Sequence, residues 1–131
     1  MRSAGLQAVL VGLAAAALVG CTNQPIYAVS EAPVETFDGR PVTMAEVEQA
    51  IARAGAALGW RTHLAEPGLI VASYRWRGYT AVVQVAFGTK TFSITYRNSA
   101  NLNYDGTNIH RTYNDWIRRL ETSIRAQLRT L

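Results

Sequence analysis

The sequence predicts an α+β domain in which a four-stranded antiparallel meander is flanked by an N-terminal and a C-terminal helix, in the order α-β-β-β-β-α. Two observations support this prediction. Two segments repeat apolar residues with the period of 3.6 that is typical of an amphipathic helix. Between them, apolar and polar residues alternate over four segments joined by short turns, as in consecutive antiparallel strands. We expect both helices to pack on one sheet face and to close a single core.

The first helix is expected from Thr43 to about Leu58. Thr43 and Glu46 have the spacing of a capping box, in which the threonine hydroxyl accepts the Glu46 backbone N–H and the glutamate side chain reaches back. Gly59 suits the end of this helix, because glycine adopts left-handed backbone angles without strain. The apolar stripe consists of Met44, Val47, Ile51, Ala54 and Leu58.

The four strands are expected at residues 60–64, 69–77, 79–87 and 91–98. Turn sequences with glycine separate them. Alternation within each strand predicts one buried sheet face and one face in contact with water. The residues expected on the buried face are Ile70, Ala72, Tyr74, Trp76, Ala81, Val83, Val85, Phe87, Phe92, Ile94 and Tyr96.

The last helix has the clearest periodicity and is expected to continue to Leu131. Its start is open: Thr107 or Asn108 can cap it, or Thr112 with Asp115 can cap a later start. Its apolar stripe consists of Ile109, Tyr113, Trp116, Ile117, Leu120, Ile124, Leu128 and Leu131. Since they lie on this stripe, Tyr113 and Trp116 are interpreted as core residues.

Residues 1–20 have the pattern of an export signal that ends in a lipobox. Arg2 supplies the positive start, residues 6–18 form an apolar run, and the motif Leu-Val-Gly-Cys ends at Cys21. The run is shorter than the about 20 residues that span a bilayer. This pattern resembles that of bacterial lipoproteins. The resemblance implies cleavage before Cys21, a diacylglycerol on its sulfur and an N-acyl chain. The alternative is an ordinary secretory signal with an incidental cysteine.

The residue after the lipobox bears on the destination of the protein. Thr22, rather than aspartate, follows Cys21. In this respect the chain resembles lipoproteins that are sent to the outer membrane. We therefore expect a location in the outer membrane facing the periplasm.

Residues 21–41 are expected to form the lipidated N-terminus and a flexible tether. This segment contains three prolines and shows neither a helical nor a strand period. Twenty residues would reach at most about 66 Å when extended and would average about 25 Å as a flexible chain. The alternative is that residues 26–29 add to the sheet as a short edge strand. Residues 42–131 then form one globular periplasmic domain.

Composition and motifs argue against several classes of function. Cys21 is the only cysteine, so the chain has no internal disulfide and, once Cys21 is lipidated, no free thiol. His63 and His110 fall on different predicted elements without carboxylates at ligand spacing, which disfavours a metal site. No nucleophile elbow or phosphate-binding glycine loop is found. We therefore expect no catalytic residues, no metal and no cofactor other than the lipid.

The charge balance is basic. Removal of residues 1–20 takes only Arg2 from the 13 basic residues and leaves nine acidic residues, so the mature chain carries a side-chain net charge of +3. An envelope location disfavours nucleic acid as a partner despite a pI of about 9.6. Anionic lipid, peptidoglycan and an envelope protein remain as candidate partners.

Two groups of side chains are candidates for binding. The alternation assigns Arg61, Arg75, Arg77 and Arg97 to the wet sheet face, together with His63. Guanidinium groups bind phosphate and carboxylate through paired hydrogen bonds, although charged residues also simply solvate an open sheet.

The second candidate is the loop before the last helix, which contains Asn101, Asn103 and Tyr104. These side chains suit a polar ligand or the edge of a protein. The alternative is a hydrogen-bonded turn that positions the last helix.

Three stretches of the domain also resemble a group of small proteobacterial lipoproteins of unknown function. They are residues 53–60 (RAGAALGW), 96–104 (YRNSANLNY) and 109–116 (IHRTYNDW). The resemblance implies a fold and an envelope address, but transfers no catalytic residue. The expected function is that of a non-catalytic binding or assembly accessory of the outer membrane or cell wall. The alternative is a small cell-wall hydrolase or a modulator of such an enzyme.

Overall fold

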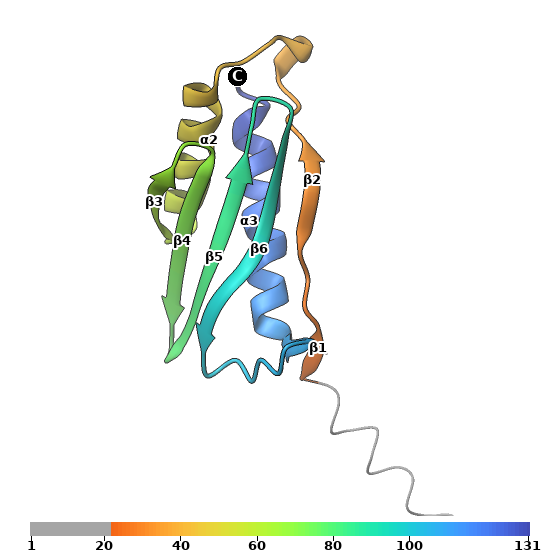
Figure 1. The fold of residues 1–131 in the computed structure, drawn as a ribbon, viewed down its shortest axis with the longest axis vertical. Helices are drawn as coiled ribbons and strands as arrows, with labels where there is room; N and C mark the ends of the chain where they lie inside the picture. The colour runs from red at the N-terminus through yellow and green to blue at the C-terminus, as the bar shows by residue number, and fades with distance from the viewer. Residues whose placement is uncertain (1–21) are drawn as a thin grey trace, which may run out of the picture.

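The computed structural model describes residues 22–131, which form two antiparallel sheets and two helices (Figure 1). The main sheet has five strands in the order β2-β6-β5-β4-β3. Its strands are β2 (Val29–Pro33), β3 (Arg61–Glu66), β4 (Leu69–Trp76), β5 (Tyr79–Phe87) and β6 (Thr91–Ala100). The small sheet pairs β1 (Asn23–Pro25) with β7 (Asn108–His110). The helices are α2 (Met44–Ala57) and α3 (Arg111–Leu128), and a short 3-10 turn, η1, covers Phe37–Gly39.

The predicted fold class was wrong in the number and arrangement of the strands. Instead of a single four-stranded meander, the described residues contain seven strands in two sheets. Two of the additional strands, β1 and β2, lie in the segment that was expected to be a tether, and β7 immediately precedes α3. The first helix and the four consecutive strands do occur close to their expected positions.

Strand β2 escaped the sequence pattern for two physical reasons. It is an edge strand, where proline such as Pro33 is tolerated because no neighbour needs its missing N–H. It is also irregular, since its register with β6 shifts between Val29 and Ala32 and the intervening Glu31 has a φ of 48°. The shift brings both Val29 and Ala32 inward, at 4% and 5% exposure, so apolar residues do not alternate with a period of two.

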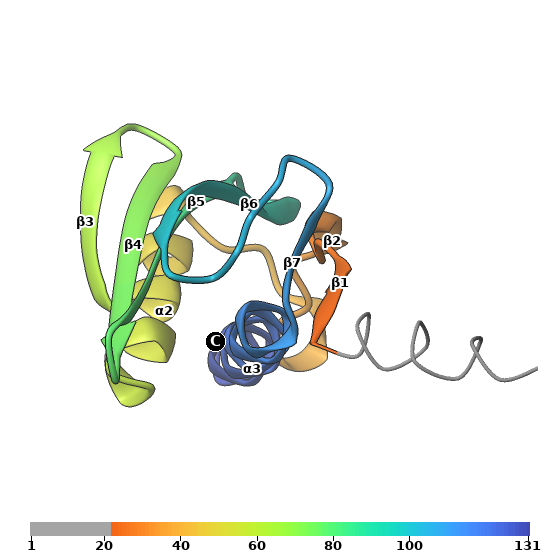
Figure 2. The ribbon, with the colours of Figure 1, turned by 90° about the horizontal axis from the view of Figure 1, so that it is seen from below.

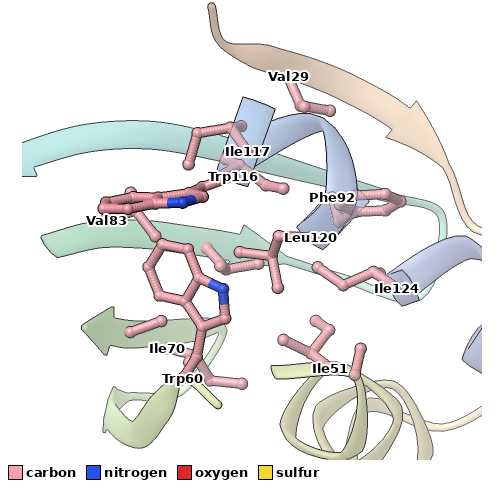
Figure 3. Close-up of a cluster of buried hydrophobic side chains, with 14 of the residues drawn as sticks. Val29, Ile51, Trp60, Ile70, Val83, Phe92, Trp116, Ile117, Leu120 and Ile124 are labelled. Carbon is pink, nitrogen blue, oxygen red and sulfur yellow. The ribbon is translucent and has the colours of Figure 1, made fainter. Parts of the chain in front are cut away.

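The core lies between the main sheet and the two helices, which cover the same sheet face (Figures 1 and 2). Figure 3 shows side chains from both layers meeting in one cluster, including Val29 from β2 and Ile117 from α3. Burial of each large side chain in this cluster contributes about 1.5 to 3 kcal/mol. The N-terminal edge strand therefore belongs to the same core as the helices.

Helix α2 begins with the expected capping box. The backbone N–H of Glu46 donates to Thr43 Oγ1 at 3.1 Å, and the backbone N–H of Thr43 donates to Glu46 Oε1 at 3.0 Å. Helix α3 begins differently from the expected alternatives, because His110 is its cap and accepts the Thr112 N–H on Nδ1 at 3.1 Å. Histidine is an uncommon cap, which is why the sequence pattern did not single it out.

The two ends of the long axis carry different parts of the chain. Strand β1, the turn between β4 and β5 and the connection from β6 to β7 lie at one end, whereas the C-terminus lies at the other (Figure 1). The proposed signal and Cys21 lie outside the described residues. Within residues 22–131, no helix is long and apolar enough to cross a membrane.

Candidate functional site

The chain is held to α3 from its first described residues. The carbonyl of Thr22 accepts the Arg111 N–H at 2.7 Å, and the N–H of Ile26 donates to the Thr107 carbonyl at 3.0 Å. The side chain of Asn114, only 1% exposed, accepts the Tyr27 N–H on Oδ1 at 2.8 Å. The Asn114 amide donates in turn to the Pro25 carbonyl at 3.0 Å and the Gln24 side chain at 3.2 Å. Residues 22–27 are therefore part of the fold.

A polar contact farther along α3 reinforces this attachment. The Tyr27 hydroxyl donates to Glu121 Oε1 at 2.5 Å, and Arg125 donates to Oε2 of the same carboxylate at 2.8 Å. Burial raises the pKa of Glu121, but the hydrogen bonds from Tyr27 and Arg125 outweigh burial and leave the pKa below its usual value. The hydrogen bond to Glu121, followed by burial, raises the pKa of the Tyr27 phenol. Both directions favour the bonded pair of neutral phenol and ionised carboxylate.

Two of the predicted arginines line one hollow on the sheet face that the helices leave open. Arg61 lies opposite Ser73 and Arg75 lies opposite Thr80 in the strand register. The hollow measures about 470 Å³. Its lining consists of Gly59, Arg61, Ser73, Tyr74, Arg75 and Thr80. We call it the arginine hollow.

The arginine hollow forms where the edge strand β3 does not extend along the whole length of β4. Strand β3 begins at Arg61, opposite Ser73, so the last three residues of β4, Tyr74 to Trp76, have no partner strand on that side. Arg61 and Arg75 are both exposed residues. Neither forms a salt bridge to an acidic group of residues 22–131. Positive charge is therefore available to a ligand at the open edge of β4.

The other two predicted arginines lie elsewhere. Arg77 occupies the tight turn between β4 and β5, where its φ is 50° and that of Gly78 is 84°. Its guanidinium lies over the Trp76 ring, 4.8 Å from the ring centroid. Arg97 lies on β6, which β5 separates from β4. The four arginines thus do not form one cluster. Alternation along a strand predicts the sheet face of a residue, but it gives neither the geometry of a turn nor the order of the strands.

A register shift explains the position of Arg97 further. Val82 pairs with Asn98, whereas the next residue, Val83, pairs with Tyr96, so Arg97 is the extra residue of a β-bulge. A bulge turns its side chains away from regular alternation. No feature of the sequence alone marks this position.

The predicted loop is an ordered connection. Asn101 and Asn103 both adopt left-handed backbone angles, with φ of 65° and 54°. The Asn101 side chain donates to the Gly78 carbonyl at 2.7 Å, which ties the loop to the β4–β5 turn. The Tyr104 ring lies 4.0 Å from the Tyr96 ring, measured between centroids. The backbone of this loop therefore agrees with the alternative of a hydrogen-bonded turn. The Tyr104 residue is still 38% exposed.

An aromatic groove lies on the helix side of the same β4 end, and sequence reasoning missed it. Trp76 was expected in the core but is 43% exposed. The groove has a volume of about 330 Å³. Its lining consists of Tyr74, Trp76, Thr112, Asp115, Trp116 and Arg119. Tyr74 borders both the groove and the arginine hollow. The sequence signal was the position of Trp76 at the end of its strand, directly before the turn.

The described residues offer little for acid–base or metal chemistry. His63 is exposed on β3, whereas His110 caps α3. Burial raises the pKa of the Tyr113 phenol, so this residue stays protonated. No three histidine, cysteine or acidic residues between positions 22 and 131 lie close enough to hold a metal ion.

Comparisons of the chain with protein-family models, curated proteins and solved structures find no match.

Proposed function

We propose that this chain is a lipid-anchored protein of the bacterial envelope and serves as a non-catalytic binding or assembly accessory. In this proposal, Cys21 carries the acyl chains, and the domain faces the periplasm from the outer membrane. The arginine hollow binds an anionic group of the envelope. The single observation that carries the binding role is the position of Arg61 and Arg75 around one hollow without an acidic partner among the described residues.

The chemistry of the arginine hollow favours phosphate or carboxylate. Each guanidinium presents N–H donors in a planar fork that matches two oxygens of an anion. The hydroxyls of Ser73 and Thr80 lie in the same lining and add donors that carry no charge. Lipid phosphates and peptidoglycan carboxylates share this chemistry, and both are present in the envelope.

Binding assays distinguish the two sources of the anion. Purified residues 22–131 would be sedimented with vesicles that contain anionic phospholipid and, separately, with peptidoglycan, each at low and moderate salt. We expect the domain to bind either the vesicles or the peptidoglycan, and this binding to weaken as the salt concentration rises. The double variant Arg61→Ser/Arg75→Ser should weaken it further. The material that the domain binds then identifies the source of the anion. The control is Arg53→Ser/Arg129→Ser, which removes the same charge from an exposed position of α2 and from the exposed residue that follows α3.

Three outcomes would overturn the proposed function. Equal binding by the hollow variant and its control, or no binding to either material, would contradict the anion site. A clear zone on a peptidoglycan zymogram would contradict a non-catalytic role and support the hydrolase alternative. The anchor is tested separately in cells, where Cys21→Ala should abolish acyl labelling and membrane association.

A further inference from the structure

The fixed N-terminus leaves almost no slack between the proposed anchor and the domain. Thr22 is already hydrogen-bonded to Arg111, and Cys21 is the residue directly before it. One residue of extended chain covers only about 3.5 Å, whereas a flexible 20-residue tether would average about 25 Å. A lipid on Cys21 would therefore hold this end of the domain directly at the membrane.

Contacts among rings connect the N-terminal strand to the exposed tip of the main sheet. Asn23 of β1 pairs with His110, whose ring lies 5.7 Å from the Tyr79 ring. The Tyr79 ring is stacked with Trp76 at a centroid distance of 6.4 Å. These contacts lead stepwise from β1 to the tip, and Figure 2, seen from below, shows β1 and β4 on opposite sides of α3.

The exposed side chains at this end suit a membrane surface. Trp76 and Tyr104 are among the exposed large hydrophobic residues, and Asn101 joins their two turns through its hydrogen bond to Gly78. Tryptophan and tyrosine are enriched at membrane–water interfaces, because the ring is apolar while the N–H or O–H stays hydrated. Arg77, which lies over the Trp76 ring, adds a positive charge that attracts anionic headgroups.

We propose that this anchor-proximal end, formed by Trp76, Arg77, Asn101, Asn103 and Tyr104, is a membrane-contacting surface. It lies in the headgroup layer of the leaflet that holds the acyl chains of Cys21, and the C-terminal end of the long axis points away from that leaflet (Figure 1). This inference rests on the proposed lipid anchor. The headgroup layer is about 5 to 8 Å thick, so side chains at the same end of the long axis as β1 reach it when β1 lies at the membrane surface.

The test uses the sole cysteine as an artificial anchor. Residues 22–131 contain every element of the described fold, so the domain beginning at Cys21 is the unit to couple. Cys21 reacts with a thiol-reactive phospholipid in vesicles, and the vesicles contain phospholipid brominated near the headgroup, which quenches nearby tryptophan. Trp60 and Trp116 are buried, at 5% and 7% exposure, so quenching reports on Trp76. We expect loss of Trp76 emission and a blue shift of the remaining spectrum.

Two matched variants show whether the anchor position decides the result. Trp76→Phe keeps an aromatic ring and should remove the quenching. Cys21→Ser with Thr130→Cys places the same lipid at the exposed opposite end and should leave Trp76 unquenched. Equal quenching from both anchor positions, or none from Cys21, would overturn the membrane-contacting surface.

A separate experiment tests whether Cys21 is lipidated in the cell. The mass of the protein isolated from cell membranes reports whether Cys21 carries acyl chains. An unmodified Cys21 would overturn the proposed anchor and, with it, the inferred contact in the cell. Quenching of Trp76 in the coupled domain would then show only that the end is capable of entering a headgroup layer.

Discussion

The buried side chain of Asn114 accepts the backbone N–H of Tyr27 at 2.8 Å, across 87 positions of sequence. This bond attaches the N-terminal segment to α3 and places the start of the fold next to Cys21. It is one of several bonds that hold this segment, together with those of Thr22 to Arg111 and Ile26 to Thr107.

The first prediction concerns Asn114 itself. Asn114→Ala leaves the Tyr27 N–H and the Pro25 carbonyl without their partner, and an unpaired buried polar group costs about 1 to 3 kcal/mol. We expect a loss of about 2 to 3 kcal/mol in the free energy of unfolding, measured by urea denaturation. Gln49→Ala on the exposed side of α2 is the control and should be nearly neutral. Equal stability of the two variants would contradict the role of Asn114.

The second prediction concerns pH and the pair of Tyr27 and Glu121. Because the pKa of Glu121 is lowered in the fold, its contribution to stability is complete above its ordinary pKa of 4.5 and is lost as pH falls through the lower folded value. Because the pKa of Tyr27 is raised, its contribution is present below its ordinary pKa of 10.0 and is lost as pH rises through the higher folded value. The pair should therefore stabilise the fold most strongly between these limits.

Tyr27→Phe isolates this contribution. The ring should remain under the guanidinium of Arg118, which lies 4.6 Å from the ring centroid, so only the hydroxyl is lost. We expect a cost of about 1 to 2 kcal/mol near neutral pH and a smaller cost near pH 3. The measurement is urea denaturation at several pH values, with Tyr104→Phe as the control for loss of a hydroxyl. A cost that does not change with pH would argue against the ionised partner.

The third prediction separates two tryptophans that the sequence assigned to the same core. Trp116→Ala should cost about 3 to 5 kcal/mol, because it empties a buried site between helix and sheet. Trp76→Ala should cost about 1 kcal/mol or less, since the residue is 43% exposed at the tip of the sheet. Chemical denaturation of both variants measures the difference. Similar losses would show that the tip is packed more tightly than the structure indicates.

The fourth prediction separates the arginines by position. Arg75→Ser removes a lining residue of the arginine hollow, whereas Arg97→Ser removes the same charge from the bulge on β6. In the sedimentation assay at low salt, binding of the domain to anionic vesicles or peptidoglycan should fall in the first variant and change little in the second. The two variants would behave alike if binding depended only on the net charge of the domain.

The sequence predicted the elements whose residues repeat regularly. Helix α2 was found from its capping box and its apolar stripe, and the central strands from alternation around short turns. These signals are local, since each depends only on residues within a few positions. The inward positions Val83 and Ile94 are accordingly both buried.

The parts of the fold and of the site that the sequence did not predict depend on contacts between residues that are distant in sequence. Strand β2 is ordered by pairing with β6 about 60 positions later, and residues 24–27 by Asn114, neither of which appears in a local pattern. The arginine hollow depends on where β3 begins relative to β4, which is a matter of register rather than of composition. Arg97 lies away from Arg61 and Arg75 because the strand order, which no local pattern gives, puts β5 between β4 and β6.

Amide hydrogen exchange of residues 22–27 in the mature protein is the most direct test of the fixed N-terminus. The N–H groups of Ile26 and Tyr27 donate to Thr107 and Asn114, so both should exchange far more slowly than in an unstructured peptide of the same sequence. Asn114→Ala should accelerate exchange at Tyr27. Protection at both positions is the predicted result, whereas exchange at the unstructured rate would show a flexible tether and contradict a domain held directly at its anchor.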